Sequence, residues 1–272
     1  MGDEISQKPP TIVLHTCTDS PPGRAVQIVL AYLNIPYRIQ TVDFDNGEHF
    51  SEEFLKMYPQ GEIPVLDDDG LIIGESVAII QYLAEKYGRT GKLSSNSTFY
   101  PADDPVQRSV IHHRLSFHLS VFQRRVYDYM ILPMDYDYPR TEANRIKLTH
   151  ALAIFDEFLR RQQEQQNLRE NQEANSGNSA AGGQGFYVAG ENFTIADPPL
   201  LMATCALVAM DMKILEPFRN IGKWLQHFQE EHPDLWTIAK EGLDGLSYYN
   251  KNPRDMSHLK HPIHPVRKGD GV

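Results

Sequence analysis

A change in hydrophobic periodicity near residue 90 constrains the fold of this chain more than any other feature. Before it, short runs rich in β-branched residues alternate with segments of helical period, and after about residue 105 only the helical period remains. The stretch between them, residues 89–104, is rich in Gly, Ser, Asn, Pro and Asp, as domain linkers are. The sequence therefore predicts an α/β domain followed by an all-α domain.

The first ninety residues predict four strands and three helices. Strands are expected at 11–15, 37–44, 63–67 and 71–73, and helices after Ser20, at 51–57 and at 76–87. A hairpin turn is expected at Asp68-Asp69-Gly70. The order is βαβα and then ββα, in which a crossover helix joins parallel strands and an antiparallel pair follows. This is the thioredoxin-like pattern.

The second half predicts long helices and one segment without regular structure. Helices are expected over 106–131, 142–166, 194–212 and 224–240. Pro133 is expected to end the first of them. Residues 162–184 are mainly Gln, Asn, Glu, Gly, Ser and Ala, with little to bury, and are predicted to be a disordered surface insertion. Thr194-Ile-Ala-Asp197 has the spacing of a box that opens a helix, so a structural role is expected for Asp197.

The domain boundaries follow from these patterns. They are a flexible tail at 1–10, the thioredoxin-like domain at 11–90, a linker at 91–104, the helical domain at 105–250 and a C-terminal tail at 251–272.

Composition narrows the classes of partner. The formal net charge of −10 argues against a nucleic-acid partner, because phosphates would be repelled. No apolar run is long enough to span a bilayer, so no membrane partner is expected. The chain holds only Cys17 and Cys205, and its first residues lack the features of a signal peptide. We therefore expect a cytoplasmic protein.

Ser20 lies between the first predicted strand and the helix that follows it. It occupies an N-cap position, and Pro21 falls where a missing N–H costs nothing. A hydroxyl is thereby left beside a helix N-terminus, whose free N–H groups and dipole favour negative charge. Alone, Ser20 would be read as a cap; the motifs downstream make it a candidate anion-binding residue.

Five motifs together resemble a cytosolic glutathione transferase over about Thr11–Trp236. They are Ser20-Pro-Pro-x-Arg24, Ile63-Pro64, the Gly70 hairpin, Glu75-Ser76 and Thr194-Ile-Ala-Asp197. Residues 47–70 are most similar to the insect Delta and Epsilon classes. Residues 252–267 resemble the transferase domain of insect proteins that carry FLYWCH zinc fingers, although two cysteines are too few for such fingers.

The resemblance implies the glutathione transferase fold, a homodimer, and glutathione as a co-substrate that is conjugated to hydrophobic electrophiles. It implies that the Ser20 hydroxyl donates to the glutathione sulfur and stabilises the nucleophilic thiolate. The implied glutathione ligands are Glu75 and Ser76 at the γ-glutamyl end, Ile63 before a cis Pro64 at the cysteinyl part, His49 at the glycyl carboxylate, and Gln60. The implied hydrophobic substrate pocket consists of Gln123, Val126, Tyr127 and Ile131.

Two departures from the Delta and Epsilon pattern leave alternatives open. Gly61 stands where these classes usually have a second histidine, and Val77 where they often have Arg or His, so two polar contacts to glutathione are lost. One alternative is a non-catalytic module that binds a ligand or has a regulatory role. Another is a thiol-disulfide oxidoreductase that uses Cys17, although a non-catalytic cysteine is the favoured interpretation.

Three tail histidines have a spacing that metal sites also use: His258, His261 and His264. Their position in a proline-containing tail favours an ordinary peptide, and no metal site is expected.

Overall fold

The computed structural model describes residues 12–88, 98–176, 185–255 and 258–265. The thioredoxin-like domain contains a four-stranded sheet with the order β2-β1-β3-β4. Its elements are β1 (Ile12–Thr16), α1 (Pro21–Tyr32), β2 (Tyr37–Thr41), the 3-10 turn η1 (Glu48–Phe50), α2 (Glu52–Met57), β3 (Val65–Asp68), β4 (Leu71–Ile73) and α3 (Ser76–Tyr87). β1 is parallel to β2, whereas β3 is antiparallel to both β1 and β4. The predicted thioredoxin-like topology is confirmed.

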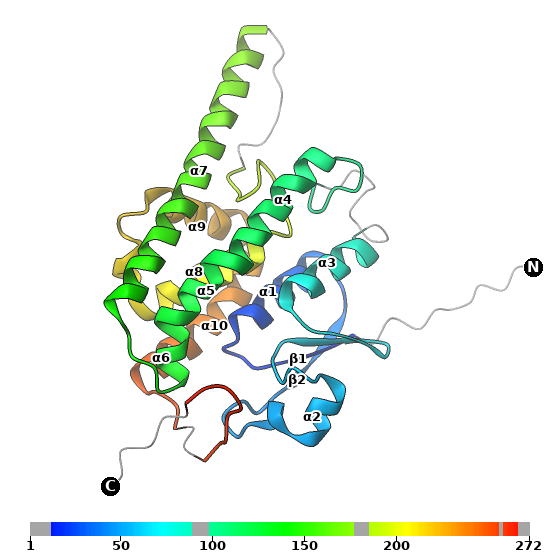
Figure 1. The fold of residues 1–272 in the computed structure, drawn as a ribbon. Coiled ribbons are helices and arrows are strands. Elements are labelled where there is room, and N and C mark those ends of the chain that lie inside the picture. Colours follow the sequence, from blue (N-terminus) through cyan, green and yellow to red (C-terminus); the bar gives the residue numbers. More distant parts are fainter. Residues whose placement is uncertain (1–11, 89–97, 177–184, 256–257, 266–272) are drawn as a thin grey trace, which may run out of the picture.

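The sheet is covered differently on its two faces (Figure 1). α1 and α3 lie on the face toward the helical domain, and α1 packs against two of that domain's helices, α8 (Asp197–Asp211) and α10 (Pro233–Lys251). α2 covers the opposite face through a small cluster in which Phe54 meets Val42 and Val65. Because one buried core runs through both domains, the relative position of α1 and the helical domain is fixed by packing.

The helical domain begins with a long, nearly uninterrupted helical segment. It consists of α4 (Pro105–Phe117), the π-helical turn η2 (His118–Phe122), α5 (Gln123–Val126), the π-helical turn η3 (Tyr127–Ile131) and α6 (Leu132–Asp135). The prediction that Pro133 ends the helix is wrong, because helical structure continues to Asp135. The wide turn directly before Pro133 loosens the backbone ladder, and a ring without an N–H is then tolerated.

The next two predicted helices also differ from expectation. α7 (Glu142–Ser176) continues ten residues beyond the predicted end and projects away from the body of the protein in Figure 1. The prediction of disorder from residue 162 is thus wrong as far as Ser176, and residues 177–184 lie outside the described residues. Its Arg160 forms ion pairs with Glu157 and Glu164 on the same exposed face, and such pairs support a helix without tertiary contacts.

The last predicted helix consists of two. η4 (Met212–Leu215) is followed by α9 (Arg219–Glu231) and then by α10, with the break at His232. Pro233 begins α10, because proline is favoured at the first helical position. In the described part of the chain, no helix combines the length and the apolar character needed to cross a membrane.

The C-terminal tail is not a free peptide. After Asn252 the chain turns back beneath α6 and reaches the loop before η1 (Figure 1). Its Arg254 is buried, and the backbone carbonyl of Pro265 accepts a hydrogen bond from the amide of Asp137. The expected N-terminal tail and the first half of the expected linker, residues 91–97, lie outside the described residues.

Candidate functional site

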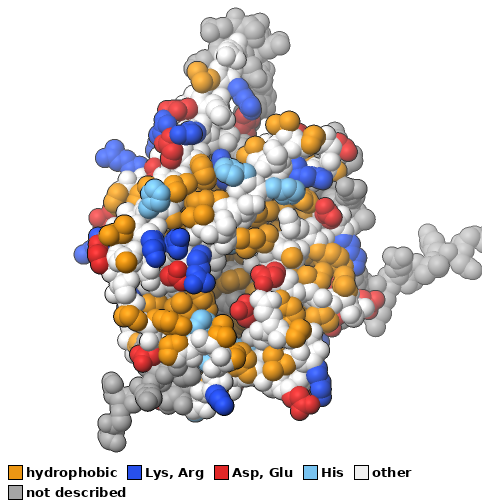
Figure 2. All heavy atoms as spheres, viewed as in Figure 1, with side chains coloured by type: hydrophobic (Ala, Val, Ile, Leu, Met, Phe, Trp, Pro, Cys, Tyr) orange, Lys and Arg blue, Asp and Glu red, His pale blue; other side chains and the backbone are white. Residues whose placement is uncertain are grey.

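A cavity of about 460 Å³ lies between the two domains, a size typical of small-molecule sites. Figure 2 shows a hollow on this face of the protein, with basic side chains on one side and acidic ones on the other. Arg124 of the helical domain lines the cavity, as do Glu62 and Glu75 of the thioredoxin-like domain. The sequence-predicted residues that line it are Ser20, His49, Gln60, Ile63, Pro64, Glu75, Ser76, Gln123, Tyr127 and Ile131.

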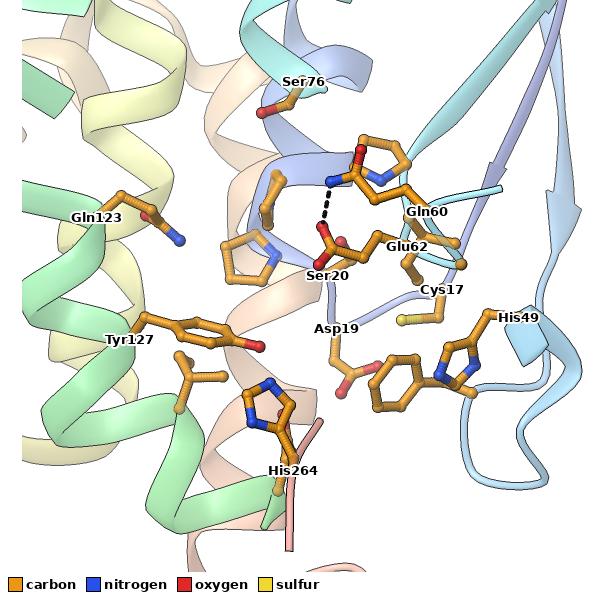
Figure 3. A pocket seen from close by; sticks show the side chains of 18 of the residues that line it. Cys17, Asp19, Ser20, His49, Gln60, Glu62, Ser76, Gln123, Tyr127 and His264 are labelled. Atoms are coloured by element: carbon orange, nitrogen blue, oxygen red, sulfur yellow. Dashed lines mark hydrogen bonds between the residues drawn. The ribbon is translucent and has the colours of Figure 1, made fainter. Parts of the chain in front are cut away.

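Ser20 lies at the start of α1 and faces the cavity (Figure 3). Its Oγ accepts a hydrogen bond from the Gly23 amide at 3.2 Å, which confirms the predicted cap. A hydroxyl has one hydrogen to donate as well as lone pairs to accept with, so the cap leaves the Ser20 hydrogen available to a ligand. Pro21 and Pro22 follow and have no N–H, which means that the free amides expected at this terminus are missing. Stabilisation of an anion here therefore depends on the hydroxyl and the helix dipole.

The start of α3 offers a second polar end of the cavity. Glu75 precedes the helix with φ of 62°, a left-handed conformation that is uncommon for a residue with a side chain. No side chain caps the helix, so the first N–H groups, beginning at Ser76, are not used by a cap. The Glu75 carboxylate accepts a hydrogen bond from Gln60 Nε2 at 2.8 Å. A carboxylate and free helix amides thus lie side by side, which suits a ligand carrying both an ammonium and a carboxylate.

His49 lines the cavity but is only 2 % exposed. Its ring is stacked on Phe44 with centroids 4.4 Å apart and is tilted against Phe50 at 3.9 Å. Among the described residues, neither ring nitrogen has a hydrogen-bond partner. Burial, with a contribution from nearby His261, lowers the pKa of His49 to about 4, so the imidazole is neutral at physiological pH. It can offer a carboxylate an N–H but no positive charge.

Three of the four positions predicted for a hydrophobic substrate pocket line the cavity. Gln123, Tyr127 and Ile131 line the cavity, and Figure 3 shows the Tyr127 ring pointing into it. Val126 does not line it; its side chain is 1 % exposed and belongs to the core. The π-helical turns before and after α5 shift the faces of this segment relative to a regular helix, and a prediction from an α-helical period misassigns one position.

The two departures from the family pattern have structural reasons. Gly61 has φ of 64°, and a Cβ there would lie 3.2 Å from the carbonyl oxygen of His49. A histidine at this position would be strained, because left-handed backbone favours glycine. Val77 is 5 % exposed and contributes to the core, so it places no polar group in the cavity. The Ile63–Pro64 peptide bond is cis, as the resemblance implied.

Cys17 lines the cavity near Asp19 and His49 (Figure 3). Burial and the nearby Asp19 carboxylate raise the pKa of the Cys17 thiol far above its ordinary value. The thiolate is the reactive form, so this cysteine is a poor nucleophile at neutral pH. Burial beside a carboxylate therefore favours the non-catalytic interpretation of Cys17 over the oxidoreductase one.

Charged residues that sequence reasoning missed complete the site. Glu62, Asp19, Asp135 and Arg254 all line the cavity. Glu62 accepts a hydrogen bond from Gln60 Nε2 at 3.0 Å, and burial raises its carboxyl pKa (Figure 3). Burial also raises the pKa of Asp135 to about 6, against the opposing charge of Arg254. Arg254 lies in a stretch without periodicity, and nothing in its sequence neighbourhood indicates that it is buried.

Within the described part of the chain, no group of three or more His, Cys, Asp or Glu side chains has the geometry to hold a metal ion. The three tail histidines instead contact aromatic side chains and the backbone. His261 Nε2 lies 3.3 Å from the Tyr136 hydroxyl, and His258 Nε2 lies 3.0 Å from the carbonyl oxygen of Asp45.

A thioredoxin-like domain, an all-helical domain and a polar-to-apolar cavity between them together define the glutathione transferase class of fold. Residues 14–91 match the family model described as "Glutathione S-transferase, N-terminal domain". The chain is 28 % identical over 241 residues to glutathione S-transferase D7 of Anopheles gambiae, which covers 87 % of this chain and 96 % of that protein.

Solved structures of glutathione transferases are also similar to this chain. A diazinon-metabolizing glutathione S-transferase of the silkworm Bombyx mori is 32 % identical, with a TM-score of 0.70 over 86 % of this chain and 98 % of that one. A glutathione transferase homologue from Drosophila mojavensis, solved with bound glutathione, is 25 % identical with a TM-score of 0.70, over 90 % and 98 % of the two chains. The chain belongs to the glutathione S-transferase family, and the structures that it resembles include a delta-class transferase of Nilaparvata lugens and an epsilon-class transferase of Musca domestica. Members of this family are enzymes with glutathione as co-substrate.

Proposed function

We propose that this protein binds glutathione along the cavity and conjugates its sulfur to hydrophobic electrophiles, with Ser20 stabilising the thiolate. The observation that carries the proposal is that Ser20, Glu75 and Ser76 line one cavity, although more than fifty residues separate the first from the other two. The apolar side of the same cavity, with Tyr127, Ile131 and Met202, offers room for an electrophile beside the sulfur.

The proposed chemistry needs one hydrogen-bond donor to the sulfur and close approach of the sulfur to the electrophile. The Ser20 hydroxyl donates to the sulfur, lowers its pKa and so raises the thiolate population at neutral pH. Against an aryl chloride, the thiolate forms a C–S bond, the C–Cl bond breaks, and chloride leaves with the electron pair while the thiol proton passes to solvent. Holding both reactants in one cavity supplies proximity.

The two ends of glutathione would then be bound as follows. The γ-glutamyl ammonium would contact Glu75, and its carboxylate would contact the Ser76 hydroxyl and the free amides of α3. Gln60, which already donates a hydrogen bond to Glu75, would also lie at the γ-glutamyl end. The main chain of Ile63 would contact the cysteinyl part, and His49 would face the glycyl end as a neutral donor.

The acidic lining of the cavity supports a second candidate, a non-catalytic ligand-binding module. Asp19, Glu62 and Glu75 all line it, and carboxylates near the sulfur site disfavour a thiolate. Such a module would bind its ligand without accelerating conjugation.

Calorimetry with glutathione and a conjugation assay with chloro-dinitrobenzene separate the two candidates. We expect the wild type to bind glutathione and to show a glutathione-dependent rate, and Ser20→Ala to lose about two orders of magnitude of that rate. Ser51→Ala is the matched control, because Ser51 caps α2 in the same way, by accepting from the Phe54 amide at 3.1 Å, and does not line the cavity. Binding without any rate in the wild type would support the module, and no binding would contradict both.

Three finer assignments follow from the family resemblance and belong to this proposal. They are a homodimeric assembly, a cytoplasmic location, and a relation of the C-terminal segment to the transferase domain of FLYWCH-bearing insect proteins. Sedimentation of the purified protein tests the first, since a monomer at micromolar concentration would contradict it.

A further inference from the structure

The C-terminal segment, defined here as the described residues 252–255 and 258–265, is attached to both domains by one arginine. Arg254 Nη1 lies 3.0 Å from Asp135 Oδ1 at the end of α6, and Nη2 forms an ion pair with Asp19 next to Ser20. Its Nε lies 2.5 Å from Asp45 Oδ1, and its guanidinium lies 3.6 Å from the centroid of the Tyr249 ring. Arg254, with a side chain only 6 % exposed, is thus held by three carboxylates and one aromatic ring.

The rest of the C-terminal segment packs beside one end of the cavity. Leu259 packs against the cluster of Leu132 and Tyr136, and a Cβ on Gly47 would come within 2.8 Å of it. His261 Nδ1 accepts hydrogen bonds from the amides of Ile263 and His264, at 3.2 and 2.9 Å. These contacts form a tight turn that places both histidines against the Tyr136 ring.

This turn closes one end of the cavity. Pro262, Ile263 and His264 are among the lining residues, and Figure 3 shows the His264 ring facing Tyr127. At the same end the His261 ring meets Phe50, which covers His49 from the other side. The C-terminal segment therefore contributes lining residues, and its His261 packs on Phe50, one of the two rings that enclose His49.

We propose that the C-terminal segment is a specificity-determining wall of the cavity, positioned by Arg254, which limits the size of electrophile that can lie beside Tyr127. The proposal rests on the proposed function for the identity of the substrate, but the wall itself is testable without turnover. Arg254 is a positioning residue, because it acts through the carboxylates that it joins.

The kinetic test compares a small electrophile, chloro-dinitrobenzene, with a bulkier aryl electrophile. In His264→Ala and in a chain shortened to end at Pro253, we expect the ratio of kcat/KM for the bulky substrate over that for the small substrate to rise by about tenfold. A change of this order is typical when the space available in a substrate pocket changes. His258→Ala is the matched control, since His258 lies on the same segment and does not line the cavity. A second control ends the chain at Pro265.

The physical test follows the imidazole of His49 by NMR titration. The shortened chain lacks His261, whose ring packs on Phe50 beside His49 and whose proximity helps to lower the His49 pKa. We therefore expect the pKa of His49 to rise by at least about one unit from its low wild-type value in the shortened chain, with no change in the two controls. If the wild type shows no glutathione-dependent rate, the proposed function is overturned. The His49 titration alone then tests the proposal that the C-terminal segment forms a wall of the cavity. An unchanged substrate ratio in both variants, or an unchanged His49 titration in the shortened chain, would overturn the wall.

Discussion

Asp197→Asn offers a sharp test of how the helical domain is held together. The Asp197 carboxylate is fully buried at the start of α8. Its Oδ2 accepts from the amide and the hydroxyl of Thr194 at 2.9 and 3.0 Å, and its Oδ1 accepts from the Val188 amide at 2.9 Å and from Trp224 Nε1 at 3.3 Å. Four donors thus converge on one side chain, and the burial that raises its pKa to about 6 leaves it ionised at neutral pH.

The expected magnitude follows from replacing one oxygen with an amide group. Whichever oxygen is replaced, an NH₂ then faces two donors, and two charge-assisted hydrogen bonds of about 1.5–3 kcal/mol each are lost. The free energy of unfolding should fall by about 3–6 kcal/mol, a large part of a total that is typically about 5–15 kcal/mol.

Urea unfolding at neutral pH, followed by circular dichroism, measures this loss. Asp104→Asn is the control: Asp104 caps α4 at an exposed site by accepting from the Gln107 amide, and asparagine caps equally well, so its change should be near zero. If Asp197→Asn differs from this control by less than about 1 kcal/mol, the four-bond account of Asp197 is refuted.

Three further predictions concern the site and its surroundings. In Gly23→Ala the new Cβ would lie 2.0 Å from Thr16 Oγ1, so the melting temperature should fall. Gly-to-Ala changes in helices often raise the melting temperature instead, and a rise here would show that the Thr16 side chain can rotate away. Cys17 should react with a thiol reagent more slowly than free cysteine at neutral pH, and Cys17→Ser should keep its conjugation rate; a reactive Cys17 would reopen the oxidoreductase interpretation. Burial lowers the pKa of His49 and His118 to about 4, so the unfolded chain takes up protons at a higher pH than the folded chain does. The stability due to these histidines is therefore lost as the pH falls from 6.5 toward 4. Urea midpoints that rise as the pH falls through this range would contradict the burial of both rings.

Local signals in the sequence predicted the first domain well. α3 has the predicted bounds because Gly88 follows it and Glu75-Ser76 opens it, and the caps at Ser20 and Ser51 were readable from residue type alone. The end of α7 could not be predicted from the sequence, because a segment with little to bury resembles a disordered one.

The residues of the site could be predicted where they stand at a local feature of the backbone, such as a helix start. They could not be predicted where their position depends on contacts between distant parts of the chain. Ser20 and Glu75-Ser76 stand at helix starts, which the sequence marks. The contacts of Arg254 with Asp45 and of His261 with Phe50 join residues more than two hundred positions apart, and no periodicity in the sequence indicates such contacts. Val126 was misassigned because π-helical turns flank it.

The pKa of the glutathione thiol in the complex tests the central claim most directly. Thiolate absorbance in the ultraviolet, followed against pH for the wild type, Ser20→Ala and Ser51→Ala, reports this pKa. The account predicts a bound thiol that titrates at least about one unit below a free thiol in the wild type and in Ser51→Ala, and that returns to about the free value of 8.5 in Ser20→Ala. A wild-type complex whose thiol titrates like free glutathione, or a Ser20→Ala complex that keeps the lowered pKa, would contradict it.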